Sequence, residues 1–167
     1  MSRPQITKHM FPRDLPVWAS FYLSEAGQQY DGWEFDVVVG NPYDPGSFYP
    51  PAARKQAIYL NSLKIDAVAW FSNTPRILEF KPSAGSGAIG QVLCYQEWYS
   101  RIFNVRPLGM IICEDMSPQV RSIAEFLGIE VVEIPPANTP TTNAAIWDVE
   151  RKIVHRSMLP ILSALSA

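Results

Sequence analysis

Two short and mostly apolar segments, residues 64–71 and 75–82, carry ionisable side chains where an ordinary strand would carry apolar ones. Each segment has the length and composition of a β-strand that is buried on both faces. The first contains Asp66, and the second contains Glu79 and Lys81. A buried charge costs several kcal/mol unless it is paired or bound to a metal. The fold must therefore bring these side chains together, either as an ion-pair cluster in an ordinary α/β domain or around a divalent metal ion.

Strand geometry favours the metal. Successive side chains alternate between the faces of a sheet, so Glu79 and Lys81 share one face while Phe80 lies on the other. The connection at residues 72–75 is short enough for a hairpin, which would place Asp66 beside Glu79. Two carboxylates completed by waters suit Mg²⁺ or Mn²⁺. Lys81 would then orient or deprotonate the attacking water.

A further pair of polar side chains follows on the next predicted element. A glycine-rich turn at residues 84–88 leads into a predicted helix over residues 87–101. Gln91 and Tyr95 are four residues apart, so they share one face of that helix. The sequence thus predicts a strand, a second strand and a helix that each contribute polar groups to one place.

The ordered pattern Asp, then Glu-x-Lys, then Gln-x-x-x-Tyr resembles the PD-(D/E)XK nuclease superfamily, and within it the RecB-like exonuclease branch. The resemblance implies that the two acids bind the metal and that the lysine assists the attacking water. It also implies that the glutamine and tyrosine line the site or contact DNA. Carried over position by position, the catalytic set is Asp66, Glu79, Lys81, Gln91 and Tyr95, and the metal-ligand set is Asp66, Glu79 and Phe80.

The match departs from the family pattern in three places. Ile65 stands where the motif has its proline, and no upstream histidine motif of the RecB type is visible. Some members use an additional acid near the N-terminus, and Glu25 is the residue that we assign to this role.

The remaining segments predict an α/β fold. We expect a restriction-endonuclease-like core of order α-β-β-β-α-β, with a central mixed sheet flanked by helices and a C-terminal helix in addition. Residues 1–134 are interpreted as one nuclease-like domain. The other expected elements are an N-terminal helix (14–28), a strand (33–40), a loop (41–51), a short helix (52–60), a strand (107–113), a helix (117–127) and a last strand (129–134).

The C-terminal part has a different character. Residues 135–143 are rich in proline and threonine and predict an extended linker. Residues 144–167 predict a helical extension that is broken or kinked at Pro160. Its apolar stripe would either fold back onto the core or contact a neighbouring subunit or partner protein. The stripe consists of Trp147, Val154, Met158, Ile161 and Leu165.

The charge distribution limits the expected partners. The net charge of −2 is not that of a tight DNA binder, so we expect weak, salt-sensitive DNA binding. Residues 14–53 contain six acids and no base, whereas basic residues follow from Arg54 onward. The apolar runs are too short to span a membrane, and the polar N-terminal stretch does not resemble a secretion signal. We therefore expect no membrane contact and a cytoplasmic protein, in the host cytoplasm or the virion if a phage encodes it.

Two functions follow from these expectations. The first is a magnesium-dependent (or manganese-dependent) nuclease that hydrolyses phosphodiester bonds in DNA. The second is a catalytically silent module on the same fold, serving as a phage virion or assembly component or in another protein interaction. The complete set of costly polar residues favours the nuclease, while the proline-rich composition (15 prolines) and the tethered helix favour the silent module.

Overall fold

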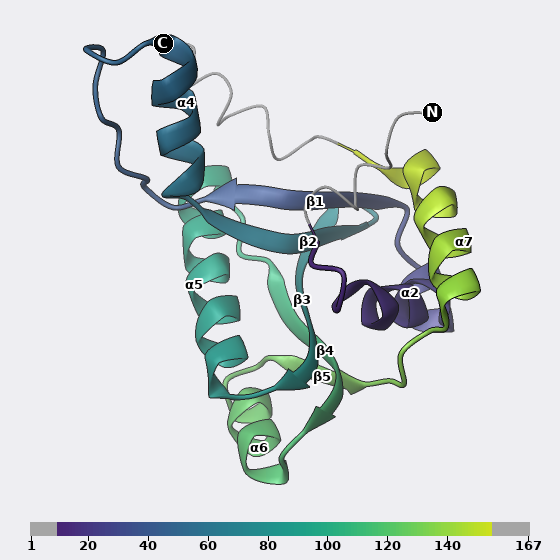
Figure 1. Ribbon diagram of the computed structural model, residues 1–167. Helices are drawn as coiled ribbons and strands as arrows, with labels where there is room; N and C mark the ends of the chain where they lie inside the picture. The colour runs from purple at the N-terminus through teal and green to yellow at the C-terminus, as the bar shows by residue number, and fades with distance from the viewer. Residues whose placement is uncertain (1–9, 155–167) are drawn as a thin grey trace.

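A five-stranded mixed sheet forms the centre of the computed structural model, which describes residues 10–154 (Figure 1). The strands lie in the order β1-β2-β3-β4-β5. The first three are antiparallel neighbours, whereas β3, β4 and β5 run parallel. Their bounds are β1 Gly32–Val39, β2 Leu63–Phe71, β3 Thr74–Ala84, β4 Leu108–Met116 and β5 Glu130–Glu133.

Helices cover both faces of the sheet. On one face, α2 and α7 pack around a core that contains the buried Trp18, Trp33 and Phe80. On the other face, α5 packs across β1, β2, β3 and β4, and α6 packs beside it on β4 and β5. The helices are α2 Leu15–Leu23, α3 Glu25–Gln28, α4 Pro51–Leu60, α5 Ser86–Phe103, α6 Pro118–Phe126, α7 Thr139–Val149 and the 3-10 turn η1 Glu150–Lys152.

These observations confirm the predicted fold class. The chain is an α/β protein whose elements follow the order expected of a restriction-endonuclease-like core, with a mixed sheet and flanking helices. The predicted hairpin is present, because β2 and β3 are antiparallel with Phe71 opposite Thr74. Ser72 and Asn73 connect the strands with φ of 46° and 69°, the positive values that a tight two-residue hairpin turn requires.

The N-terminal helix is shorter than predicted. The expected helix over residues 14–28 is divided at Ser24, whose backbone is extended with ψ of 162°. The Ser24 side chain accepts a hydrogen bond from Gly27 N at 3.2 Å and so caps the separate helix α3. Ser24 therefore ends helix α2 and caps helix α3, although it stands inside an apolar helical pattern.

The expected linker is also shorter than predicted. Helix α7 begins at Thr139, because Asn138 accepts a hydrogen bond from Thr141 N at 2.9 Å and Pro140 occupies the first turn. The segment before it lies against α2, since Ala137 N donates to Pro16 O at 2.9 Å.

Helix α7 packs onto the core that contains α2. Ala145, Ile146 and Val149 are buried in the cluster that holds Trp18 and Trp33, whereas Trp147 is 54% exposed. A hydrogen bond of 2.5 Å from Tyr22 Oη to Asp148 Oδ2 also joins α2 to α7. Of the predicted apolar stripe, Met158, Ile161 and Leu165 lie outside the described residues.

After α7, the chain pairs with the outer edge of the sheet. Ile153 forms a parallel bridge with Trp33, and Val154 N donates to Trp33 O at 2.8 Å. The free edge of β1 is covered there. Within residues 10–154, no helix is both long and apolar enough to cross a membrane.

One part of the chain projects from the body. Residues 41–60, comprising the loop 41–50 and helix α4, extend beyond the end of β1 and the start of β2 (Figure 1). We call this segment the arm. In α4 only Ile58 is buried.

Candidate active site

The predicted site lies where the sheet divides. The hydrogen-bonded ladder between β2 and β3 ends at the pair Ala67 and Leu78. Beyond it, β2 continues beside β1 and β3 continues beside β4, and the two halves of the sheet diverge (Figure 1). Asp66 and Glu79 are the next residues on either side of this fork. The main chains of Asp66 and Glu79 are therefore not paired with each other in the ladder. Phe80 N donates a hydrogen bond to Asp66 Oδ2 across the gap at 3.3 Å.

Glu79 is the most costly residue of the site. Its side chain is almost completely buried on β3. Oε1 lies 2.7 Å from Lys81 Nζ, and the Asp66 carboxyl is within hydrogen-bonding reach of the same side chain. A buried carboxylate normally has all of its oxygens hydrogen-bonded. Beyond Lys81 and Asp66, no donor within residues 10–154 reaches the Glu79 carboxyl, so part of its bonding capacity is unused.

Burial and like charge act on both acids. Burial raises the pKa of Glu79, and the neighbouring Asp66 carboxylate raises it further, against the opposing effect of Lys81. Burial also raises the pKa of Asp66, opposed by the charge of Lys81 and the Phe80 N–H. Both carboxyl groups therefore resist ionisation in the protein alone. A cation between them would remove this penalty.

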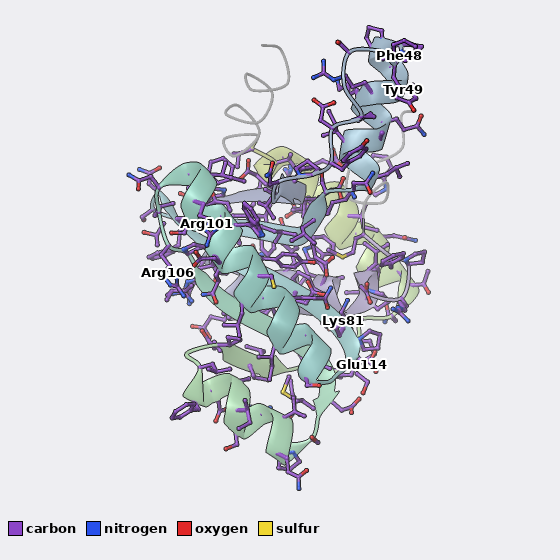
Figure 2. The ribbon with its side chains drawn as sticks, turned by 90° about the vertical axis from the view of Figure 1, so that its left-hand side faces the viewer. Phe48, Tyr49, Lys81, Arg101, Arg106 and Glu114 are labelled. Carbon is purple, nitrogen blue, oxygen red and sulfur yellow. The ribbon has the colours of Figure 1, made fainter. Side chains whose placement is uncertain are left out.

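Lys81 is held as a cation. Burial by itself lowers the pKa of Lys81, but the hydrogen bond and charge of Glu79 and the charges of Asp66 and Asp14 outweigh it, so the net pKa is raised. The side chain remains partly exposed beside α5 (Figure 2). An ammonium group in this state donates hydrogen bonds and stabilises negative charge, and it does not accept a proton. Both roles expected of Lys81 from the sequence stay predictions, and a cation is suited to orienting a water molecule.

Helix α5 brings the two remaining predicted residues to the same place. Gln91 Nε2 lies 3.4 Å from Tyr95 Oη, as their spacing predicted. Burial raises the pKa of Tyr95 to about 12, and the charges of Glu79 and Asp66 contribute to this rise. Tyr95 is therefore a neutral hydroxyl next to the carboxylates, able to donate a hydrogen bond to them or to a bound phosphate.

Asp14 belongs to this cluster and was not predicted. It is fully buried at the start of α2, and neither of its oxygens has a hydrogen-bond partner within residues 10–154. Burial raises its pKa, and Lys81 and Arg13 oppose the rise. Its charge in turn raises the pKa of Asp66. Asp14 therefore lies close enough to the acids and the lysine to share their electrostatic field.

The sequence pattern around Asp14 indicates a helix cap and not a site residue. An aspartate just before an apolar helix is usually an N-cap. Here Pro16 removes the N–H of the second helical position, and the Asp14 side chain forms no capping bond. Glu25, which we had assigned as the N-terminal acid, is exposed at the start of α3. The assignment to Glu25 is therefore replaced by Asp14.

The donor set fits a hard divalent cation that keeps several waters. Within the described residues, no three histidine, cysteine or acidic side chains are grouped as a complete metal cage. Asp66 and Glu79 supply two carboxylates, and the unsatisfied oxygens of Glu79 are the ones such an ion would use. The Phe80 ring is buried against Phe21, so Phe80 can contribute only its main-chain carbonyl. Mg²⁺ in proteins typically binds few protein oxygens and completes its coordination shell with water.

Replacing Glu79 with glutamine is expected to stabilise the metal-free protein while removing cleavage. The amide keeps the shape of the side chain without the cost of a buried charge. Because the folded-state pKa of Glu79 is raised above its ordinary value of 4.5, wild type loses stability as pH rises from that value. The variant should be more stable by about 1 kcal/mol at neutral pH, with a smaller difference near pH ~5. Urea denaturation in EDTA at the two pH values measures this, and a less stable variant would contradict it.

Comparison with known proteins yields one structural likeness over part of the chain. No protein-family model matches the chain, and no curated protein matches it. A solved structure described as a repair endonuclease from Pyrococcus abyssi aligns with a TM-score of 0.40 and 17% sequence identity. The alignment covers 44% of this chain and 33% of that one, so the chain spans about a third of the length of the matched structure. A match of this extent says nothing about catalytic residues or substrate.

Proposed function

We propose that this protein is a metal-dependent nuclease that hydrolyses phosphodiester bonds in DNA. The observation that carries the proposal is the buried Glu79 carboxylate, left with one cationic neighbour at the fork of the sheet. A merely structural ion pair would be expected to satisfy its oxygens, because an unsatisfied buried charge destabilises the fold. A site that awaits a cation has a reason to leave them open.

Each residue around the fork would have a separate role in such a reaction. Asp66 and Glu79, with the Phe80 carbonyl, would hold Mg²⁺ or Mn²⁺. The bound ion would offset charge on the phosphate and increase the acidity of water. Lys81, as an ammonium, orients the attacking water and stabilises negative charge that develops on the phosphate. Tyr95 and Gln91 form a hydrogen-bonded pair that can fix the scissile phosphate from the side of α5.

The order of these residues along the chain supports a finer assignment. The glutamine and tyrosine follow the Glu-x-Lys strand on the next helix, as in the RecB-like branch of the PD-(D/E)XK nucleases. The acidic balance of the chain is compatible with DNA contact that is weak and sensitive to salt. A nuclease of this kind encoded by a phage would act on DNA in the host cytoplasm.

The test is cleavage of supercoiled, linear and single-stranded DNA at low salt with each of three metals. Wild type is expected to cleave with Mg²⁺ or Mn²⁺ and not with Ca²⁺ alone, since Ca²⁺ binds oxygen sites with looser geometry. Glu79→Gln, purified identically, serves as the matched control and should be inactive. If no substrate is cleaved and Mn²⁺ does not bind, the silent interaction module becomes the better description.

A further inference from the structure

The arm presents aromatic side chains to solvent. Tyr43, Phe48 and Tyr49 are 71%, 97% and 52% exposed, and all three lie in the loop 41–50 (Figure 2 labels Phe48 and Tyr49). Isolated exposed apolar residues are normal on a protein surface, but three aromatic rings in one short loop are a local concentration. This concentration suggests that the loop meets a ligand with flat apolar faces.

The loop is built to hold these rings in place. Asp44 accepts hydrogen bonds from Arg54 Nε at 2.7 Å and from Gly46 N at 2.9 Å, which fastens the loop to α4. At the base of the arm, the Tyr59 hydroxyl donates to Asp36 on β1. Ordering the loop in advance reduces the entropy lost when a ligand binds. The aromatic residues are thus displayed on a defined support.

The charge of the arm differs from that of the whole protein. Residues 41–60 contain two basic side chains and one acidic, in a chain with a net charge of −2. The acid, Asp44, is neutralised by Arg54, which leaves Lys55 as the excess positive charge of the arm. Lys64 adds a second positive charge on β2, at the base of the arm. Exposed aromatic rings on a segment of excess positive charge are the combination that suits single-stranded nucleic acid, because bases stack and phosphates attract cations.

The arm is directly connected to the site. Lys64 lies two residues before Asp66 on β2, so the base of the arm and the fork are close together along one strand. Lys64 Nζ also lies 4.4 Å from the centre of the Tyr59 ring at the base of α4. In Figure 2 the arm, with Phe48 and Tyr49, lies at one end of the molecule, and Lys81 lies nearer its middle, beside α5. A strand that follows the arm toward its base would arrive at the fork.

We propose that the arm binds single-stranded nucleic acid by stacking bases on Tyr43, Phe48 and Tyr49, with Lys55 and Lys64 facing phosphates. Paired bases in a duplex hide their faces, so the rings select an unpaired strand or end. The delivery of that strand to Asp66 and Glu79 rests on the proposed nuclease function. The binding by the arm does not depend on it.

The test is fluorescence anisotropy in EDTA with labelled oligothymidylate, oligouridylate, an abasic oligomer of equal length and a duplex. Phe48→Ala combined with Tyr49→Ala should weaken binding of the single strands roughly tenfold or more. Wild type should prefer oligothymidylate to the abasic oligomer, and the double variant should lose that preference. Phe126→Ala is the matched control, because this ring is 86% exposed on α6 at the far end of the molecule. The oligouridylate measurement distinguishes RNA from DNA as the preferred strand.

Equal binding by wild type and the double variant would overturn the proposal, and so would equal affinity for thymidylate and abasic oligomers. Equal binding is also the outcome if the arm docks a protein. The same proteins assayed for cleavage separate the two hypotheses. Base-dependent binding without cleavage would support nucleic-acid binding by the arm and contradict the proposed nuclease function. If the double variant cleaves and binds as wild type does, the nuclease function would be supported and nucleic-acid binding by the arm would be contradicted.

Discussion

Replacing Lys81 with alanine is expected to lower DNA cleavage roughly a hundred- to a thousandfold while metal binding is retained. Lys81 Nζ contacts the Glu79 carboxylate at 2.7 Å and remains partly exposed, so it can reach a water or phosphate at the fork. Removing it takes away a positive charge that the reaction needs and leaves both acids in place. The loss should therefore appear in the rate of cleavage and much less in the affinity for the ion.

The two effects are measured separately. Cleavage is followed with Mg²⁺ and Mn²⁺, and Mn²⁺ binding is followed by isothermal titration calorimetry. Asp66→Asn should lose both properties, because the amide removes the negative charge of one expected ligand. Arg106→Ala, at an exposed arginine beyond the end of α5 that lies away from Lys81 (Figure 2), controls for a general loss of positive charge. Undiminished cleavage by Lys81→Ala would point to a contaminating nuclease or to a different site.

Deleting the residues after Pro135 is expected to unfold the protein or destabilise it by several kcal/mol. The deletion removes Ala145, Ile146 and Val149 from the cluster that contains Trp18 and Trp33. It also removes the hydrogen bond between Tyr22 and Asp148 and uncovers the edge of β1. Loss of large buried side chains costs a few kcal/mol each, through lost burial and the cavities that remain.

A pair of point variants in α7 tests the same idea without deletion. Ile146→Ala should cost about 2 to 4 kcal/mol, because the side chain is only 6% exposed and packs in the core. Trp147→Ala, at the adjacent and 54% exposed residue, should change stability by less than ~1 kcal/mol. Urea denaturation gives both values. A deleted chain with an unchanged denaturation midpoint would mean that residues after Pro135 form a separable extension.

The sequence was sufficient for the hairpin and for the relative position of the polar residues. Period-two alternation placed Glu79 and Lys81 on one face, and helical spacing placed Gln91 beside Tyr95, which the contacts between these side chains bear out. These relations are local, since each depends on a few neighbouring residues and on fixed backbone geometry. The metal and the roles of the residues stay predictions, which the cleavage and binding measurements above test.

Relations between distant segments were not predictable in this way. Asp14 reaches the site only because α2 packs across the sheet, and no spacing along the chain encodes that contact. The early start of α7 depends on a cap by Asn138 inside a stretch whose prolines and threonines suggested a linker. The arm was interpreted as a loop and a short helix, and its projection away from the body became visible only in three dimensions.

The fork has a consequence for how activity can be lost. Asp66 belongs to the half of the sheet formed with β1, and Glu79 belongs to the half formed with β4. The separation of the two acids is therefore set by the packing beneath each half, including buried core residues such as Phe35 and Ile111. A repacked core can move the acids apart without changing either of them. A related chain that retains all five site residues can for this reason be inactive, and an inactive one can regain function through substitutions far from the chemistry.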